Sequence, residues 1–177
     1  MPAAEAMVFI LTGEVHSGKT SLLKKVIPLL QARRRVTGYV CESVGEGDSI
    51  KGYDLVEIGG GRFPLLRRGN PPDRQNVGPF FLEEEGMRQA ERILGQASPG
   101  SLLIVDEIGP LELEGGGVRA ALEKALSRKT GPVLVVIRQP LLDDLMASLG
   151  LQSATVVRAD SPDAARRLAG VLGEDPA

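Results

Sequence analysis

A glycine-rich stretch near the start of the chain has the residue types needed to hold a phosphate chain. Residues 13–20 read Gly-Glu-Val-His-Ser-Gly-Lys-Thr, a complete match to the P-loop pattern. Glycines let successive backbone N–H groups converge on phosphate oxygens at the positive end of a helix. Lys19 is expected to neutralise the β- and γ-phosphates, and the Thr20 hydroxyl to bind magnesium. The residues expected to contact the nucleotide are Gly13, Glu14, Val15, His16, Ser17, Gly18, Lys19, Thr20 and Ser21.

The neighbouring sequence supplies the context that a P-loop requires. Residues 7–11 form an apolar run with the length of a buried strand. After the motif, apolar residues recur at helical spacing up to residue 30. Pro28 lies within this pattern and is expected to kink the helix or mark its last turn. A strand before the loop and a helix after it favour phosphate binding over a chance match.

A pair of acids at the end of an apolar run is the second candidate for chemistry. Residues 102–107 read Leu-Leu-Ile-Val-Asp-Glu, and such a run is typical of a parallel sheet covered on both sides. Open α/β folds bind ligands at the carboxyl ends of their strands. We therefore expect Asp106 to bind magnesium and Glu107 to orient or deprotonate the attacking water. The glutamate favours hydrolysis, since a kinase has to exclude water rather than activate it.

Phosphoryl transfer also requires positive charge at the transition state. Arg138 directly follows the apolar run 133–137, which is expected to be a core strand ending on the ligand-binding edge. We therefore predict that Arg138 is a catalytic residue that senses the γ-phosphate. Four other arginines are weaker candidates: Arg62, Arg67, Arg68 and Arg74.

The elements that must position these residues alternate between strand and helix patterns along the chain. Helical patterns over residues 87–94, 118–126, 141–149 and 161–172 alternate with apolar runs at 102–105, 133–137 and 155–157. This alternation predicts a three-layer α/β fold. Residues 38–80 instead carry two strand patterns around a turn-rich stretch, which predicts an inserted β-hairpin extended by residues 63–66. We expect one domain over residues 1–177.

Composition excludes several classes of protein. The net charge is −2, so no basic excess predicts nucleic-acid binding. Cys41 and His16 are the only residues of their types, which excludes an internal disulfide and argues against a zinc site. Residues 1–6 do not resemble a signal peptide, and no apolar run is long enough to cross a membrane. We expect a cytoplasmic protein. Aromatic residues form only 3% of the chain, so loose base selectivity is expected.

Further motifs in the same order resemble the thermophile-type nucleoside-triphosphatase family, whose relatives include the human cancer-related nucleoside-triphosphatase. They are Gly38-Tyr39, Gly52-Tyr53-Asp54, Val77-Gly78-Pro79-Phe80 and residues 106–113, Asp-Glu-Ile-Gly-Pro-Leu-Glu-Leu. The resemblance extends from the first strand to the fourth helix. Asn76 and Cys41-Glu42-Ser43 depart from residues that are frequent in the family, so the chain looks like a divergent bacterial-type member.

The resemblance implies a RecA-like domain with a mainly parallel central sheet and an inserted β-hairpin. It also implies Mg²⁺-dependent hydrolysis of ATP, GTP and other nucleoside triphosphates to diphosphates. By position, Lys19 and Thr20 would bind phosphate and magnesium, Asp106 would belong to the magnesium shell, and Glu107 would be the base. Two alternatives remain: a nucleotide or small-molecule kinase on the same scaffold, and a nucleotide-dependent switch acting on a protein partner.

Overall fold

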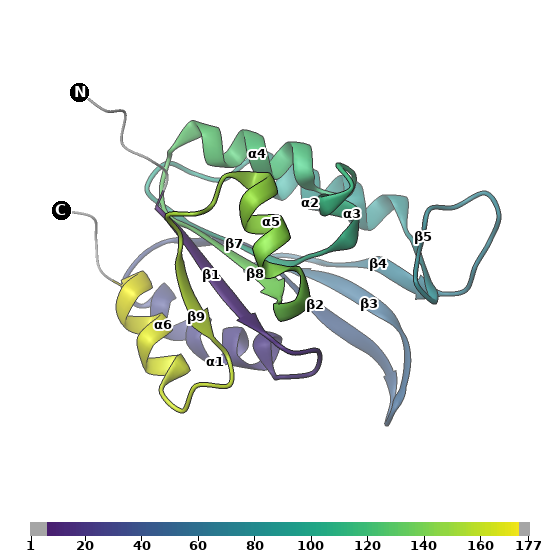
Figure 1. Cartoon of the computed structure of the whole chain (residues 1–177), viewed down its shortest axis with the longest axis horizontal. Helices are drawn as coiled ribbons and strands as arrows, with labels where there is room; N and C mark the ends of the chain where they lie inside the picture. Colours follow the sequence, from purple (N-terminus) through teal and green to yellow (C-terminus); the bar gives the residue numbers. More distant parts are fainter. Residues whose placement is uncertain (1–6, 174–177) are drawn as a thin grey trace.

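The computed structural model describes residues 7–173, so the expectation about residues 1–6 lies outside the described part. A single twisted sheet lies between two layers of helices (Figure 1). Helices α1 (Lys19–Gln31) and α6 (Ala164–Gly173) cover one face. The other face carries α2, α4 and α5. These span Glu84–Gly95, Arg119–Arg128 and Leu142–Leu149, with the short α3 (Pro110–Leu113) and the 3-10 helix η1 (Gln139–Leu141) beside them.

The sheet has nine strands among the described residues, in the order β5-β6-β4-β3-β2-β7-β8-β1-β9. Strands β2, β7, β8, β1 and β9 pair in parallel, and the remaining pairings are antiparallel. The bounds are β1 Val8–Gly13, β2 Val36–Glu46, β3 Ser49–Glu57, β4 Arg62–Arg68, β5 Asn76–Val77, β6 Phe80–Leu82, β7 Leu102–Ile108, β8 Val133–Arg138 and β9 Thr155–Arg158. The predicted three-layer α/β fold is confirmed.

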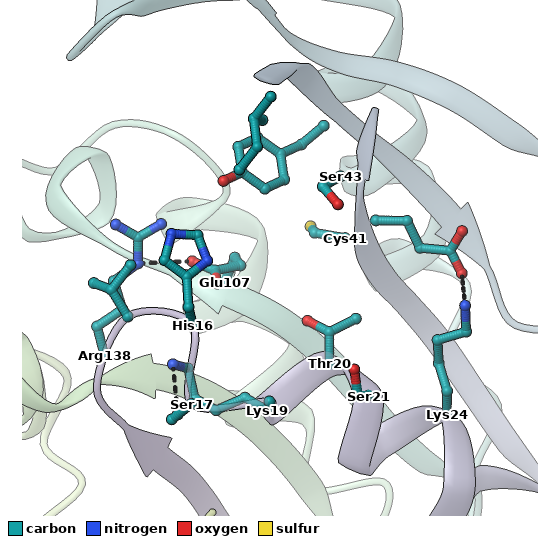
Figure 2. A pocket seen from close by; sticks show the side chains of 15 residues that line it. His16, Ser17, Lys19, Thr20, Ser21, Lys24, Cys41, Ser43, Glu107 and Arg138 are labelled. Atoms are coloured by element: carbon teal, nitrogen blue, oxygen red, sulfur yellow. Dashed lines mark hydrogen bonds and ion pairs between the residues drawn. The ribbon is translucent and has the colours of Figure 1, made fainter. Parts of the chain in front are cut away.

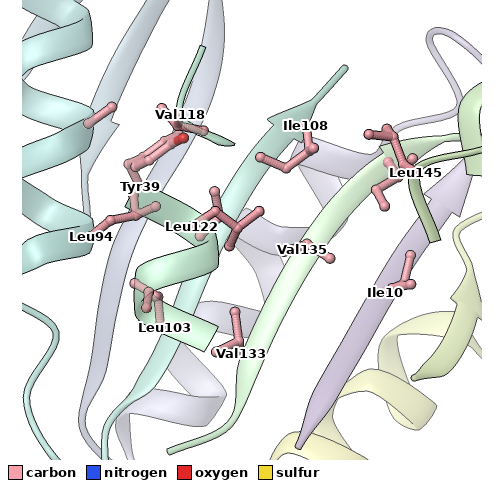
Figure 3. Packing of buried hydrophobic residues seen from close by; sticks show 14 of the residues in the cluster. Ile10, Tyr39, Leu94, Leu103, Ile108, Val118, Leu122, Val133, Val135 and Leu145 are labelled. Atoms are coloured by element: carbon pink, nitrogen blue, oxygen red, sulfur yellow. The ribbon is translucent and has the colours of Figure 1, made fainter. Parts of the chain in front are cut away.

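Apolar side chains on both faces of the parallel strands hold the layers together. On the face shown in Figure 3, Leu94 of α2, Leu122 of α4 and Leu145 of α5 belong to one buried cluster with Leu103 and Val135 of the sheet. The cluster under the other helix layer includes Leu23, Val26, Leu30, Leu168 and Leu172. Each buried leucine contributes about 1.5–3 kcal/mol relative to exposure, so both helix layers are firmly docked on the strands that carry the P-loop.

The inserted segment contains the predicted hairpin and its extension through residues 63–66, together with two short strands, β5 and β6, that the sequence did not predict. Strands β2 and β3 form that hairpin, and β4, β6 and the short β5 extend it as an antiparallel sheet. Residues 70–75 form a loop, as their Pro-Pro pair predicts. Because the insert continues β2, its strands lie in the same sheet as the parallel strands. The insert is therefore rigidly placed beside the carboxyl end of β7.

Gly38 lies where β2 leaves no room for a side chain beside its parallel neighbour β7. Its φ is 118°, and a Cβ atom built there would lie 1.9 Å from the carbonyl oxygen of Ile104 on β7. Residues Val36–Tyr39 pair in parallel with β7, and from Tyr39 onward β2 pairs antiparallel with β3. A glycine thus permits the close approach where the strand changes partner.

No helix in the described part of the chain is long and apolar enough to cross a membrane.

Candidate active site

The P-loop connects β1 to α1 and wraps around the Lys19 side chain. His16 (φ 61°) and Gly18 (φ 82°) adopt left-handed backbone conformations that bend the loop. Lys19 Nζ donates to the carbonyl oxygens of Gly13 at 3.1 Å and Glu14 at 2.7 Å. Burial lowers the pKa of the Lys19 ammonium, whereas the nearby Glu107 carboxylate raises it. These contacts hold one cation at the centre of the loop.

Asp106 lies beneath the first turn of α1. Its Oδ2 accepts a 3.0 Å hydrogen bond from the Thr20 hydroxyl and a 2.9 Å bond from the Cys41 backbone N–H. The residue is only 1% exposed, and burial, reinforced by the Glu107 charge, raises the Asp106 pKa to about 7. Its other oxygen, Oδ1, is buried and has no hydrogen-bond partner among residues 7–173.

The unpartnered oxygen of Asp106 and the neighbouring Thr20 hydroxyl fit a magnesium ion. Both are hard oxygen donors, and Mg²⁺ is commonly held by one or two protein oxygens together with phosphates and waters. No cluster of three or more His, Cys, Asp or Glu side chains in the described chain could hold a metal by itself. The residues therefore suit a metal that arrives with a phosphorylated ligand.

Glu107 has an unusual backbone conformation that turns it toward the same site. Its φ is 61°, and the pairing of β7 with β8 shifts register between Val105 and Ile108. In a regular strand, neighbouring side chains point to opposite faces, but such a bulge can direct consecutive side chains to one site. Glu107 Oε2 lies 3.2 Å from Nε of Arg138, at the end of β8. Strained non-glycine backbone of this kind is frequent at functional sites.

A cavity of about 400 Å³ joins these residues (Figure 2). The P-loop forms one wall, the ends of β7 and β8 contribute Glu107 and Arg138, and β2 and β3 form the opposite wall. In Figure 2, Glu107, Arg138, His16 and Lys19 lie on one side of the cavity, across from Lys24 of α1. The cavity thus combines a phosphate-binding loop, a cation, a carboxylate–arginine pair and the Thr20 hydroxyl of the potential metal site.

A family model described as NTPase matches residues 8–160. This chain belongs to the NTPase family. Two curated relatives, both named Nucleoside-triphosphatase THEP1, come from Hyperthermus butylicus and Thermotoga maritima. The first is 32% identical over 136 residues, covering 76% of this chain and 72% of the relative. The second is 34% identical over 123 residues, covering 67% of each.

Solved structures agree with this family. The solution structure of a human cancer-related nucleoside triphosphatase superposes with a TM-score of 0.75 at 26% identity, over 94% of this chain and 96% of that one. The crystal structure of THEP1 from Aquifex aeolicus superposes with a TM-score of 0.77 over 95% and 100%. At 21% identity, the second comparison supports the fold alone. The relationships confirm the predicted family and the prediction that the chain is a hydrolase.

In this NTPase-family chain, seven of the nine predicted loop residues line the main cavity. They are Val15, His16, Ser17, Gly18, Lys19, Thr20 and Ser21; Gly13 and Glu14 instead face Lys19 through their carbonyl groups. Glu107 and Arg138 line the cavity, whereas Asp106 lies buried behind Thr20. The roles proposed for these side chains remain predictions.

The four arginines of the insert lie elsewhere. Arg62 and Arg67 both pair with Asp54, and Arg74 pairs with Glu83. Arg68 donates to the carbonyl oxygen of Ile50 and packs over the Phe80 ring. None of the four lines the main cavity, which leaves Arg138 as the arginine placed to reach a phosphate.

Sequence reasoning did not identify Lys24, Glu42, Ser43 and Ile50 as part of the site. All four line the main cavity, and Lys24 Nζ lies 2.7 Å from the Glu42 carboxylate. Lys24 could have been found, because it lies one helical turn after Thr20 and therefore on the same face of α1. The other three lie on the β2–β3 hairpin, and the sequence did not reveal that this hairpin lies against the P-loop.

Proposed function

We propose that this protein hydrolyses nucleoside 5′-triphosphates, ATP and GTP among them, to diphosphate and phosphate with Mg²⁺, and that Glu107 activates the water. One observation carries this proposal. A strained bulge near the end of β7 directs Glu107 into the cavity, where it faces Arg138 from the neighbouring strand and lies beside the Lys19 loop. Family membership supports the general reaction, and the geometry supports the assignment of the base.

The loop is suited to hold the triphosphate. Its backbone N–H groups and the α1 N-terminus provide fixed dipoles for phosphate oxygens. Lys19 would exchange its bonds to the carbonyls of Gly13 and Glu14 for charge-assisted bonds to the β- and γ-phosphates. Thr20 and Asp106 would hold Mg²⁺, which when bound supplies positive charge to the phosphate oxygens.

Glu107 and Arg138 would act on the reacting atoms. Glu107 would accept a proton from the water that attacks the γ-phosphorus in line with the leaving diphosphate. Arg138 would donate a hydrogen bond to a γ-phosphate oxygen and stabilise the negative charge that redistributes in the transition state. The ion pair between Arg138 and Glu107 orients the Glu107 carboxylate. Both groups come from strand ends, so their positions change little when substrate binds.

Base recognition is expected to be weak. Beyond the P-loop and the Glu107–Arg138 pair, the cavity is lined by Lys24, Cys41, Glu42, Ser43, Ile50 and Tyr53. The lysine and the glutamate already pair with each other, and Tyr53 is the one aromatic ring among these residues. A site with few rings and few free donors discriminates poorly between purines and pyrimidines, so we propose similar turnover of all four triphosphates.

The test is phosphate release from ATP, GTP, CTP and UTP with Mg²⁺, by the wild type and by Glu107→Gln. The amide keeps the size of the side chain and an acceptor for Arg138 but cannot take a proton. We expect wild-type turnover on several bases and a loss of roughly 10²-fold or more in the variant, with triphosphate binding retained in fluorescence titrations.

Glu114→Gln is the matched control, because Glu114 is an exposed acid seven residues further along the chain. It should hydrolyse like the wild type. Normal turnover by Glu107→Gln would refute the assignment of the base. Tight binding without phosphate release by the wild type would refute hydrolysis itself.

A further inference from the structure

A second cavity of about 340 Å³ adjoins the nucleotide site on the side of the insert. Glu107 and Arg138 line both cavities, as do Val15, Cys41 and Tyr53. The second cavity then extends away from the P-loop, between the insert and the segment that follows β7. Glu107, the proposed base, therefore lines two cavities, and the triphosphate is expected to occupy only the first.

The walls of the second cavity are mainly apolar and rich in rings. Strands of the insert and helix α2 contribute Leu65, Leu66, Val77, Leu82 and Met87. The chain has only two tyrosines, four phenylalanines and no tryptophan. Both tyrosines and Phe80 line this cavity, and Tyr53 packs edge-on against Phe80 with ring centroids 5.5 Å apart. Half of the aromatic residues thus line this one cavity, which suits a ligand with an apolar aromatic ring.

The charges in the cavity select against an anionic ligand. Within residues 7–173, Arg138 is its one lining cation, and Glu107 already pairs with that arginine. Asp106, Glu107 and Glu112 are lining acids. A nucleoside monophosphate would bring a phosphate with no free cation to receive it. A neutral molecule with a hydroxyl group could instead donate a hydrogen bond to Glu107.

We propose that the second cavity binds a small uncharged aromatic alcohol, which receives the γ-phosphoryl group in place of water. The alcohol oxygen attacks the γ-phosphorus, and its proton passes to the Glu107 carboxylate. The bond between the γ-phosphorus and the β,γ-bridging oxygen breaks, and the nucleoside diphosphate leaves with the electron pair. The products are a phosphate monoester and a diphosphate. This inference rests on the nucleotide site of the proposed function but not on hydrolysis being efficient.

The experiment uses the full chain with Mg²⁺ and γ-labelled ATP, and benzyl alcohol or 2-phenylethanol as the probe. Glycerol at equal concentration is the control alcohol, since it offers hydroxyl groups without a ring. We expect phosphate ester formation that saturates with the aromatic alcohols and exceeds that with glycerol about tenfold or more. Burying an aromatic ring stabilises binding by more than the ~1.4 kcal/mol to which a tenfold ratio corresponds.

Two variants of Met87 test whether the acceptor alcohol binds in the second cavity. Met87 on α2 lines the second cavity and does not line the first. Met87→Trp should fill the cavity and abolish ester formation while hydrolysis stays near the wild-type rate. Met87→Ala should enlarge the cavity and keep ester formation. Thermal melting of both variants shows whether they fold.

The outcomes separate this inference from the proposed function. Hydrolysis without ester from either aromatic alcohol overturns the inference and leaves the hydrolase. Ester formation without measurable hydrolysis supports the inference and refutes the hydrolase. Ester formation that persists in folded Met87→Trp places the acceptor elsewhere and overturns the inference. If neither product forms, both proposals fail.

Discussion

Asp106 and Glu107 show how neighbouring acids acquire different properties. Asp106 is 1% exposed and accepts two hydrogen bonds, whereas the Glu107 side chain is 30% exposed and pairs with Arg138. A buried acid beside a hydroxyl suits a metal, and a partly exposed acid suits proton transfer to and from water. Local environment rather than residue type therefore distinguishes their proposed roles.

Lys19→Ala is expected to weaken triphosphate binding. The side chain is the cation at the centre of the loop, and a hydrogen bond to a charged group contributes about 1.5–3 kcal/mol. The dissociation constant should therefore rise roughly 10- to 150-fold, as measured by calorimetry with a non-hydrolysable triphosphate. Lys25→Ala, on the exposed side of the same helix, is the control and should bind normally. Equal affinities for the two variants would contradict the role of Lys19.

Arg138→Ala is expected to lower turnover more than binding. Arg138 contacts Glu107. Removing a donor that stabilises charge developing in the transition state lowers kcat by about 10²–10³-fold. Arg138→Lys keeps the positive charge but not the planar guanidinium, so its kcat should lie between those of the wild type and the alanine variant. Steady-state kinetics provide the measurement. A change confined to KM would indicate that Arg138 only binds substrate.

At the scale of elements, the segment after β7 is held by one buried acid. The Glu112 carboxylate accepts the Gly109 N–H at 2.9 Å and the Val118 N–H at 3.0 Å. Glu112 therefore holds together the two ends of the segment that contains α3. Asp106 and Glu107 lie just before this segment. Glu112 is 7% exposed, and burial raises its pKa. These bonds give Glu112 a structural role in the segment after β7.

Glu112→Gln is expected to destabilise the protein. A glutamine has one acceptor oxygen, so one of the two backbone N–H groups would face an amide N–H and remain unsatisfied. Such a buried unsatisfied group costs about 1–3 kcal/mol, which urea denaturation can measure as a lower free energy of unfolding. Glu114→Gln, on the exposed side of the same segment, should leave that free energy unchanged. Wild-type stability of Glu112→Gln would show that the loop does not depend on these bonds.

At the scale of the whole molecule, the nucleotide site joins elements that are distant in sequence. Residues of the P-loop, α1, β2, β3, β7 and β8 line the main cavity. A ligand that contacts all of them favours the folded chain over the unfolded one. Binding should therefore be visible as global stabilisation, and not only as a local change.

Mg²⁺ with a non-hydrolysable triphosphate is expected to raise the melting temperature. At a ligand concentration 100 times the dissociation constant, the stabilisation is about 2.7 kcal/mol. For a chain of this size that corresponds to roughly 5–11 °C. Chelation of Mg²⁺ should remove most of the shift, and Asp106→Asn should remove its Mg²⁺-dependent part. An equal shift with and without Mg²⁺ would contradict the proposed metal site.

The strongest sequence signals were local. The P-loop, the apolar run that ends in Asp106 and Glu107, and the alternation of strands and helices are patterns over adjacent residues, and the structure places them as predicted. Helix and strand periodicities can be recognised in this way because backbone geometry repeats over two to four residues. The short helix α3 and the short strands β5 and β6 of the insert were missed, because they depend on contacts beyond their own residues.

Tertiary structure alone decided which distant side chains meet. Arg138 faces Glu107 because β8 is the sheet neighbour of β7, and the bulge at Glu107 accompanies a shift in their pairing. The sequence could place Arg138 at a strand end but not beside that acid. The second cavity likewise exists only because the insert continues the sheet past β2. Strand order and register depend on long-range pairing and side-chain packing, and these leave no periodic signature in the chain.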